Sequence, residues 1–207
     1  MAGRSKVYVV WKGRQTGIFT TWEECAAQVQ GYPGAEYKAF ESRAMAEKAF
    51  QEDYCNYEGK PASSRQWLFA PNPPIAESYC ADAACSGSPG RLEYRCVHTA
   101  TEKEIFRQGP YENGTNNVGE FLALVHALAL FKREGIAAPV YSDSETAIAW
   151  ARSKKCKTEL LPDRRNAPLF ELVARAEAWL AENEPANPIF KWDTEAWGEN
   201  PADFNRK

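Results

Sequence analysis

The clearest indication of the architecture of this chain is the segment Ser78-Tyr79-Cys80-Ala81-Asp82-Ala83-Ala84-Cys85-Ser86-Gly87. Residues 78–84 have the apolar and aromatic content of a short strand, and Ser88-Pro89-Gly90 then turns the chain. Asp82 lies in the middle of this strand, where an aspartate is unfavourable for β structure and costly to bury. We therefore expect Asp82 to need a compensating partner, which makes it the first candidate for a functional site.

The residues that follow predict an α/β domain with a mixed sheet. Strands at 91–100 and 101–108 would form an antiparallel meander with the first strand. Helices and strands then alternate, which is typical of a sheet that also contains parallel strands. The expected helices cover 116–134, 145–153 and 166–182, the expected strands 139–142 and 188–192, and a last helical turn is expected near Pro201.

The first 50 residues predict a small ββαβα unit. Thr21 is expected to cap a helix over 22–29, with Glu24 at the capping-box position, and Ser42 to cap a second helix. The expected strands cover 6–11, 18–20 and 36–40. Residues 51–76, which include Pro71-Asn72-Pro73-Pro74, lose this periodicity. The predicted organisation is therefore an N-terminal domain at 1–50, a linker at 51–76 and a second domain at 77–207.

Composition excludes several functional classes. No apolar run approaches the roughly 20 residues that a membrane span needs, and the start of the chain lacks a signal-peptide core, so we expect a cytoplasmic protein with no membrane partner. The six cysteines form no Cys-x-x-Cys pair and are expected to be reduced thiols. Only two histidines are present, His98 and His126, which argues against zinc hydrolases and Ser-His-Asp triads. Catalysis would have to depend on carboxylates.

The charge does not exclude a nucleic-acid partner. The net charge is −3, but the first 50 residues carry +2 and the remainder −5. A basic module therefore precedes an acidic one, and the value for the whole chain says little about binding to a polyanion.

Three further acids occur where the predicted fold can bring them to Asp82. Asp143 ends an apolar strand, and ligands bind at the carboxyl ends of strands in open α/β sheets. Glu120 shares a helical stripe with Leu124 and Leu128, so it should point toward the sheet. Asp203 could approach from the C-terminal end. Two structural alternatives stay open: Asp143 as the cap of the next helix, and Asp203 as a solvated residue.

Four acids in one place predict a metal site, because like charges are unfavourable together without cations. Hard Mg²⁺ prefers oxygen ligands, and two such ions can bind the attacking water and the leaving oxygen of a phosphoryl displacement. Carboxylates without histidines favour Mg²⁺ or Mn²⁺ over zinc. We expect two Mg²⁺ ions, with Mn²⁺ as a substitute, bound by Asp82, Glu120, Asp143 and Asp203.

Four ordered blocks resemble the type 1 branch of the ribonuclease H family. They are the Asp82 strand with Gly87-Ser88-Pro89-Gly90, then Thr115-Asn116-Asn117-Val118-Gly119-Glu120, then Tyr141-Ser142-Asp143-Ser144, and finally Trp197-Gly198-Glu199-Asn200-Pro201-Ala202-Asp203. The resemblance implies a ribonuclease H-like fold, a five-stranded mixed sheet flanked by helices. It also implies a hydrolase that cuts the RNA strand of RNA·DNA hybrids and leaves 5′-phosphate and 3′-hydroxyl ends; no protein partner is implied.

The same resemblance implies roles for individual residues. The four acids match the family's metal ligands, and Glu199 matches a loop acid associated with metal exchange or product release. Residues expected near the hybrid or a DNA phosphate are Thr115, Asn116, Asn117, Thr158 and Thr194. Two positions depart from the family pattern, because Ser88 stands where many relatives have asparagine and Glu145 where many have glutamine beside the RNA 2′-hydroxyl.

Residues 6–50 resemble the hybrid-binding domain found ahead of many cellular ribonucleases H and in a caulimovirus inclusion-body protein. The blocks that carry this resemblance are Tyr8-Val9-Val10-Trp11-Lys12-Gly13-Arg14, Thr16-Gly17-Ile18-Phe19, Thr21-Trp22-Glu23-Glu24-Cys25, Gln28-Val29 and Tyr37-Lys38-Ala39-Phe40. By this resemblance Trp22, Tyr37 and Lys38 face the DNA strand. Ala39 replaces a second lysine of many relatives, which should weaken the affinity and flatten its salt dependence.

Two other functions remain as alternatives. One is a non-catalytic protein that binds RNA·DNA hybrids or double-stranded RNA and carries a relic nuclease domain, although all four acids are present. The other is a resolvase, transposase or exonuclease of the same fold, which would usually lack the Thr115-Asn116-Asn117 block.

Overall fold

The computed structural model describes residues 6–58 and 66–204, which form two compact units. One unit extends to Pro73 and includes Ala196–Gly198, and the other comprises Pro74–Glu195 and the residues from Glu199 onward. In the described part of the chain, none of the helices combines the length and apolar character that crossing a bilayer would require. The predicted division at 1–50, 51–76 and 77–207 remains a prediction.

The first unit has the predicted ββαβα order. A three-stranded antiparallel sheet has the order β2-β1-β3. Its elements are β1 (Val7–Lys12), β2 (Gly17–Phe19), α1 (Trp22–Val29), β3 (Glu36–Phe40) and α2 (Arg43–Phe50). The capping box is confirmed, since the Thr21 side chain accepts from the Glu24 amide and the Glu24 carboxylate accepts from the Thr21 amide. Short 3₁₀ helices at Tyr54–Asn56 and Gln66–Phe69 lie in the predicted linker.

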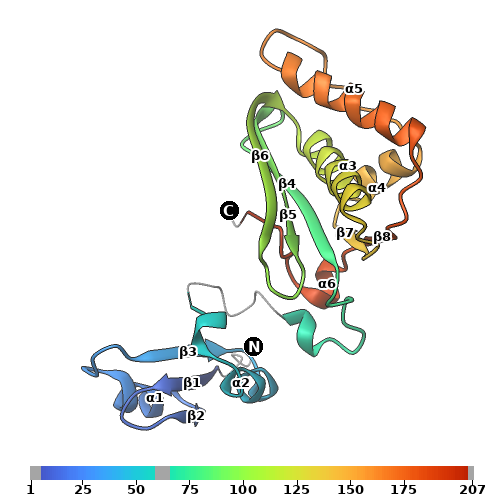
Figure 1. Ribbon diagram of the computed structural model, residues 1–207. Helices are drawn as coiled ribbons and strands as arrows, with labels where there is room; N and C mark the ends of the chain where they lie inside the picture. The colour runs from blue at the N-terminus through green and yellow to red at the C-terminus, as the bar shows by residue number, and fades with distance from the viewer. Residues whose placement is uncertain (1–5, 59–65, 205–207) are drawn as a thin grey trace. The chain divides into compact units, whose positions relative to one another are not determined.

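The second unit contains the expected five-stranded mixed sheet (Figure 1). Its order is β6-β5-β4-β7-β8, with antiparallel pairing among the first three strands and parallel pairing among the last three. The strands are β4 (Tyr79–Cys85), β5 (Gly90–His98), β6 (Glu104–Gly114), β7 (Val140–Ser142) and β8 (Ile189–Lys191). Its helices are α3 (Asn116–Glu134), α4 (Glu145–Arg152) and α5 (Ala167–Glu182), and α6 (Thr194–Trp197) begins in this unit. The α/β fold class predicted from the sequence is therefore confirmed.

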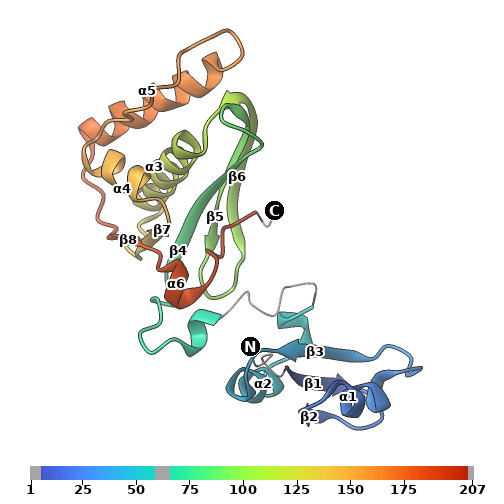
Figure 2. The same cartoon turned by 180° about the vertical axis from the view of Figure 1, so that it is seen from behind.

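Helices cover one side of this sheet, and the C-terminal segment runs along the other. Figures 1 and 2 show α3, α4 and α5 together on one side and the chain after α6 on the opposite side. Ala81 and Ala83 of β4 belong to the core that packs on α3. Because successive side chains of a strand point to opposite faces, Asp82 points to the side of the C-terminal segment.

Two expectations about element ends are wrong. No helical turn begins at Pro201, because Pro201 and Ala202 form a turn and the last described helix ends at Trp197. The third strand was expected at 101–108 but runs from Glu104 to Gly114. Pairing with β5 explains this extension, since the register continues to the Gly90–Gly114 pair through several irregularities.

Candidate active site

Three buried or half-buried acids converge at the predicted place. Each of Asp82, Glu120 and Asp143 offers a carboxylate oxygen, and these oxygens all lie within 4.8 Å of one another. Asp82 comes from the middle of β4, Glu120 from the start of α3, and Asp143 from the residue after β7. The site is therefore built from one central strand, one strand end and one helix.

A glycine brings α3 close enough for Glu120 to reach the strands. A Cβ atom at Gly119 would lie 2.5 Å from Leu92 Cδ1 and 2.7 Å from Ala83 Cβ, so a larger residue there would push the helix away from β4 and β5. Glu120 also accepts a hydrogen bond from Asn116 Nδ2 to its Oε1, at 2.7 Å. Close packing and this bond together fix the Glu120 carboxylate.

Asp143 is not the cap of the helix that follows it. Ser144 is the N-cap of α4, and its side chain accepts from the Ala147 amide at 3.1 Å. The Asp143 carboxylate is consequently available to the acid cluster. This geometry removes the structural alternative that the sequence left open for Asp143.

Burial raises the pKa values of all three acids. Desolvation is the main cause at Asp82, whose pKa lies well above its ordinary value, and the Asp143 charge raises it further. Desolvation also raises the pKa of Glu120, partly opposed by a hydrogen bond from Ser144. At Asp143 burial raises the pKa, while Lys191 and a hydrogen bond from Asn200 oppose it. The charged form of each carboxylate therefore lowers the free energy of unfolding of the metal-free protein.

One carboxylate oxygen of the cluster is buried without a partner. Among the residues that the structure describes, Asp143 Oδ1 has no hydrogen-bond donor. A buried acceptor that lacks a donor is costly, and a cation would satisfy it and offset the repulsion between the acids. An all-oxygen set of this kind suits Mg²⁺ or Mn²⁺. The residues present therefore fit the expected divalent metal.

Asp203 lies at the edge of this cluster. It is not a member of the group within 4.8 Å, but it is close enough for its charge to raise the pKa of Asp82 and Asp143, after the larger effect of burial. Asp203 is half-buried, which argues against the solvated alternative. Glu199 is exposed on the loop before it.

The residues expected to contact substrate lie on different elements of the second unit. Thr115 is the N-cap of α3, and Asn116 and Asn117 form its exposed first turn beside Glu120. Ser88 is exposed in the turn after β4, and Glu145 is the exposed first residue of α4. Thr158 instead accepts from the Leu160 amide in the loop before α5, and Thr194 is the exposed first residue of α6. Their contacts with nucleic acid remain predictions.

An aromatic group lies on the surface of the N-terminal unit. The Trp22 ring is 5.6 Å from Tyr8 and 5.9 Å from Tyr37, measured between centroids, and both Trp22 and Tyr37 are exposed. Lys38 follows Tyr37 on β3 and donates to the Tyr57 carbonyl. Trp11 is different, because its Nε1 donates to the Ala49 and Glu52 carbonyls inside the unit.

The sequence reasoning did not identify Arg95, Ser144 and Asn200. Asn200 is buried, and its Oδ1 accepts from the Ala202 amide at 2.8 Å. Arg95 donates to the carbonyls of Ala202 and Asp203. Arg95 could have been noticed in the sequence, because an arginine in the middle of an expected strand is unusual; the structure places it opposite Asp82. No comparable signal marks Ser144, because capping depends on where the helix begins.

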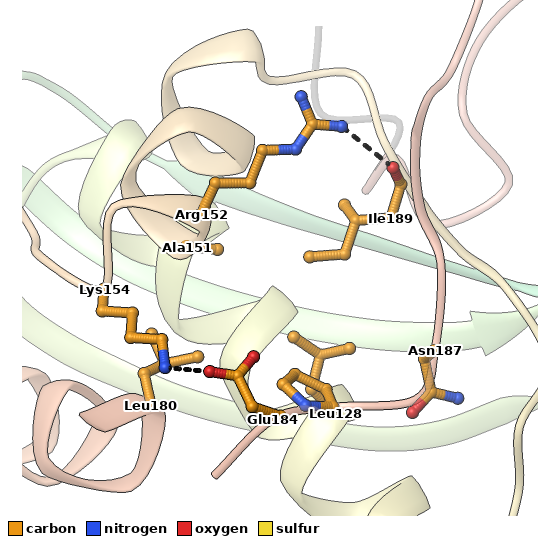
Figure 3. A pocket seen from close by; sticks show the side chains of 9 residues that line it. Leu128, Ala151, Arg152, Lys154, Leu180, Glu184, Asn187 and Ile189 are labelled. Atoms are coloured by element: carbon orange, nitrogen blue, oxygen red, sulfur yellow. Dashed lines mark hydrogen bonds and ion pairs between the residues drawn. The ribbon is translucent and has the colours of Figure 1, made fainter. Parts of the chain in front are cut away.

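A hollow elsewhere in the second unit lacks these acids. It has a volume of about 280 Å³ and lies where α3, α4, α5 and the segment before β8 meet (Figure 3). Its cations already have partners, since Lys154 pairs with Glu184 and Arg152 donates to the Ile189 carbonyl. None of the six cysteines, all of which lie in the described ranges, forms a disulfide in the structure, and their reduced state remains a prediction.

Comparison with known proteins agrees with the resemblance predicted from the sequence. Residues 6–50 match the family model described as the Ribonuclease H1 N-terminal domain. A ribonuclease H of Saccharomyces cerevisiae is 54% identical over 46 residues, which are 22% of this chain and 13% of that protein. A ribonuclease H of Schizosaccharomyces pombe is 42% identical over 65 residues, 31% of this chain and 23% of that protein. The resemblance to ribonucleases H is thereby confirmed, although the match spans less than a quarter of either relative.

Among solved structures, a ribonuclease H1 isolated from compost by a metagenomic approach is similar to 58% of this chain and 87% of its own, with a TM-score of 0.40 and 22% identity.

Proposed function

We propose that this protein is an endoribonuclease that hydrolyses the RNA strand of RNA·DNA hybrids. The observation that carries the proposal is the convergence of Asp82, Glu120 and Asp143, with an unpartnered buried oxygen on Asp143. An acid cluster of this composition occurs in the same chain as an N-terminal unit that matches the Ribonuclease H1 N-terminal domain. This combination favours a hybrid nuclease over other enzymes with clustered carboxylates.

The metal ligands in this proposal are Asp82, Glu120 and Asp143, with Asp203 completing the set for two Mg²⁺ or Mn²⁺ ions. Bound metal would supply an activated water and stabilise the charge of the leaving oxygen, and the products would carry 5′-phosphate and 3′-hydroxyl ends. Glu199, exposed on the preceding loop, would assist exchange of metal or release of product.

The chain's own residues would bind and orient the hybrid. Thr115, Asn116 and Asn117 present hydroxyl and amide donors at the start of α3, beside Glu120, and such donors suit phosphate and sugar oxygens. Glu145, exposed at the start of α4, can accept a hydrogen bond from an RNA 2′-hydroxyl. These groups would orient the scissile phosphate toward the acids.

The N-terminal unit would bind the hybrid independently of cleavage. Trp22 and Tyr37 offer exposed aromatic faces to DNA sugars, and Lys38 adds a positive charge on the same strand as Tyr37. A tethered binding unit raises the local concentration of substrate at the acids. This arrangement would increase processivity more than the rate of the chemical step.

Cleavage of a labelled hybrid tests the proposal. The full chain is incubated with an RNA·DNA hybrid, double-stranded RNA and duplex DNA, each with Mg²⁺, Mn²⁺ or EDTA. We expect cleavage of the hybrid RNA alone, and only with metal. An intact hybrid under both metal conditions would contradict the proposal.

Matched variants separate the enzyme from a non-catalytic binder. Asp143→Asn should abolish cleavage while hybrid binding persists, because the aromatic surface of the N-terminal unit is unchanged. Glu171→Gln neutralises an exposed acid on α5 and should cleave at the wild-type rate. If the wild type binds the hybrid tightly and never cuts it, the protein is a binding protein with a relic nuclease domain.

A further inference from the structure

The segment that carries Asp203 is held to the sheet by one arginine. Arg95 lies on β5 directly opposite Asp82 of β4, so the two side chains project from the same face of the sheet. Figure 2 shows the C-terminal segment on this side. The Arg95 side chain is only 16% exposed, so its guanidinium lies between the sheet and that segment.

The guanidinium donates to two successive carbonyls. Arg95 Nε lies 2.7 Å from the Ala202 carbonyl oxygen, and Nη2 lies 2.6 Å from the Asp203 carbonyl oxygen. Its planar group also lies over the Phe204 ring, 4.8 Å from the centroid. Hydrogen bonds from a charged donor are stronger than neutral ones, and two parallel bonds also fix direction.

The same turn is fixed from its other side by Asn200. The Ala202 amide donates to Asn200 Oδ1 and the Asp203 amide to the Asn200 carbonyl, each at 2.8 Å. The amides and carbonyls of Ala202 and Asp203 are therefore all hydrogen-bonded, the amides to Asn200 and the carbonyls to Arg95. No helix supports Asp203, so these bonds set the direction in which its side chain leaves the backbone.

We propose that Arg95 is a positioning residue that holds the Asp203 carboxylate beside Asp82 and Asp143 and so completes the metal site. The inference rests on the proposed function. Arg95 acts through Asp203, because its Nε and Nη2 donate to backbone carbonyls of the C-terminal segment, while its Nη1 pairs with Glu104 Oε2 at 3.5 Å. Partners that orient metal ligands in this way contribute strongly to metal affinity.

The experiment compares Arg95→Met and Arg95→Lys with Arg107→Met. Arg107 is the matched control, because its guanidinium also lies over Phe204, at 5.1 Å, and also pairs with Glu104. Its described hydrogen bonds go to Glu104, whereas those of Arg95 go to the Ala202 and Asp203 carbonyls. Amide hydrogen exchange of residues 199–204 measures the anchoring, and Mn²⁺ titration of the free protein measures the metal site. Both readouts are independent of cleavage.

We expect faster exchange in R95M and Mn²⁺ binding weaker by about 10-fold, with R107M unchanged. R95K should recover part of the affinity, because an ammonium keeps the charge but not the planar pair of donors. In an Asp203→Asn background, R95M should weaken Mn²⁺ binding no further.

Two results would overturn the inference. One is an R95M variant that matches R107M in exchange and in Mn²⁺ affinity; the other is a loss of affinity that is equally large with and without Asp203. If R95M does not fold, R95K decides by the same readouts. A wild type that neither binds Mn²⁺ nor cuts the hybrid would refute the proposed function, whereas the exchange data would still decide whether Arg95 anchors the segment.

Discussion

Asn116 donates from Nδ2 to Oε1 of Glu120, one turn further along α3, at 2.7 Å. A residue expected to touch the substrate is thus also bonded to a predicted metal ligand. Substrate contact and support of Glu120 can be separated by comparing Asn116 with Asn117. Asn117 is exposed on the same turn and has no described bond to an acid.

Asn116→Ala should weaken both metal and hybrid binding. The loss of a hydrogen bond to a charged group costs roughly 1.5–3 kcal/mol, so we expect Mn²⁺ affinity without substrate to fall by about 10-fold. Asn117→Ala should lower hybrid affinity alone. Calorimetric Mn²⁺ titration of both variants checks this prediction, and equal Mn²⁺ affinities in the two would refute the role of Asn116 at Glu120.

Neutralising one acid should stabilise the metal-free protein. The raised pKa values of Asp82 and Asp143 mean that the folded state binds protons more readily than the unfolded state, so the charged acids cost stability at neutral pH. Asp143→Asn removes one of these charges, and we expect Tm to rise by about 2–4 °C in EDTA, equivalent to roughly 1 kcal/mol.

Mg²⁺ supplies the control for that experiment. It should raise the Tm of the wild type, because it binds the folded state and compensates the acids, and should raise the Tm of D143N much less. Differential scanning calorimetry measures both effects. A lower Tm for D143N than for the wild type in EDTA, or an equal rise of Tm with Mg²⁺ in the two proteins, would contradict the proposed metal site.

Trp22→Ala should weaken hybrid binding without unfolding the N-terminal unit. Trp22 is 41% exposed, so its removal costs little packing, whereas loss of an aromatic face at a nucleic acid costs roughly 1–3 kcal/mol. Phe50→Ala is the matched control, since Phe50 is 40% exposed on α2, outside the Tyr8–Trp22–Tyr37 group. Fluorescence anisotropy with a labelled hybrid measures the affinity, and equal effects of the two variants would exclude Trp22 from the binding surface.

His126 should make the second unit less stable in mild acid. Burial lowers its pKa, and the positive charges of Arg133 and Arg175 lower it further, while its ring stacks on Phe106 at 4.0 Å. A lowered folded-state pKa means that its contribution to stability is complete above the unfolded pKa, about 6.5, and is lost as the pH falls through the folded value.

His126→Phe keeps a ring against Phe106 but cannot take up a proton. As the pH falls from 7 to 5, the free energy of unfolding should decrease more in the wild type than in H126F. Urea unfolding at several pH values measures both. Parallel pH dependences in the two proteins would show that His126 does not titrate on unfolding.

Elements that begin and end at local signals could be predicted from the sequence alone. The bounds of α1 and α3 are those predicted, because Thr21 and Glu24 form a capping box and Gly135 takes the left-handed conformation that ends α3. Asp82 was also identified from sequence, since an aspartate in the middle of a strand is costly to bury. Asp143 was identified because it ends an apolar strand, and Glu120 because it shares a helical stripe with buried leucines.

The way in which those acids are positioned depends on contacts between distant parts of the chain and could not be predicted. The sequence left Asp143 open as the cap of the next helix, but α4 begins one residue later, so Ser144 is the cap and the Asp143 carboxylate belongs to the acid cluster. Asp203 was expected beside a helical turn but lies in a turn bonded to Arg95, a residue 108 positions earlier in the chain. Bonds across such a separation form only when the sheet brings β5 and the C-terminal segment together, so no local pattern around Asp203 could reveal them.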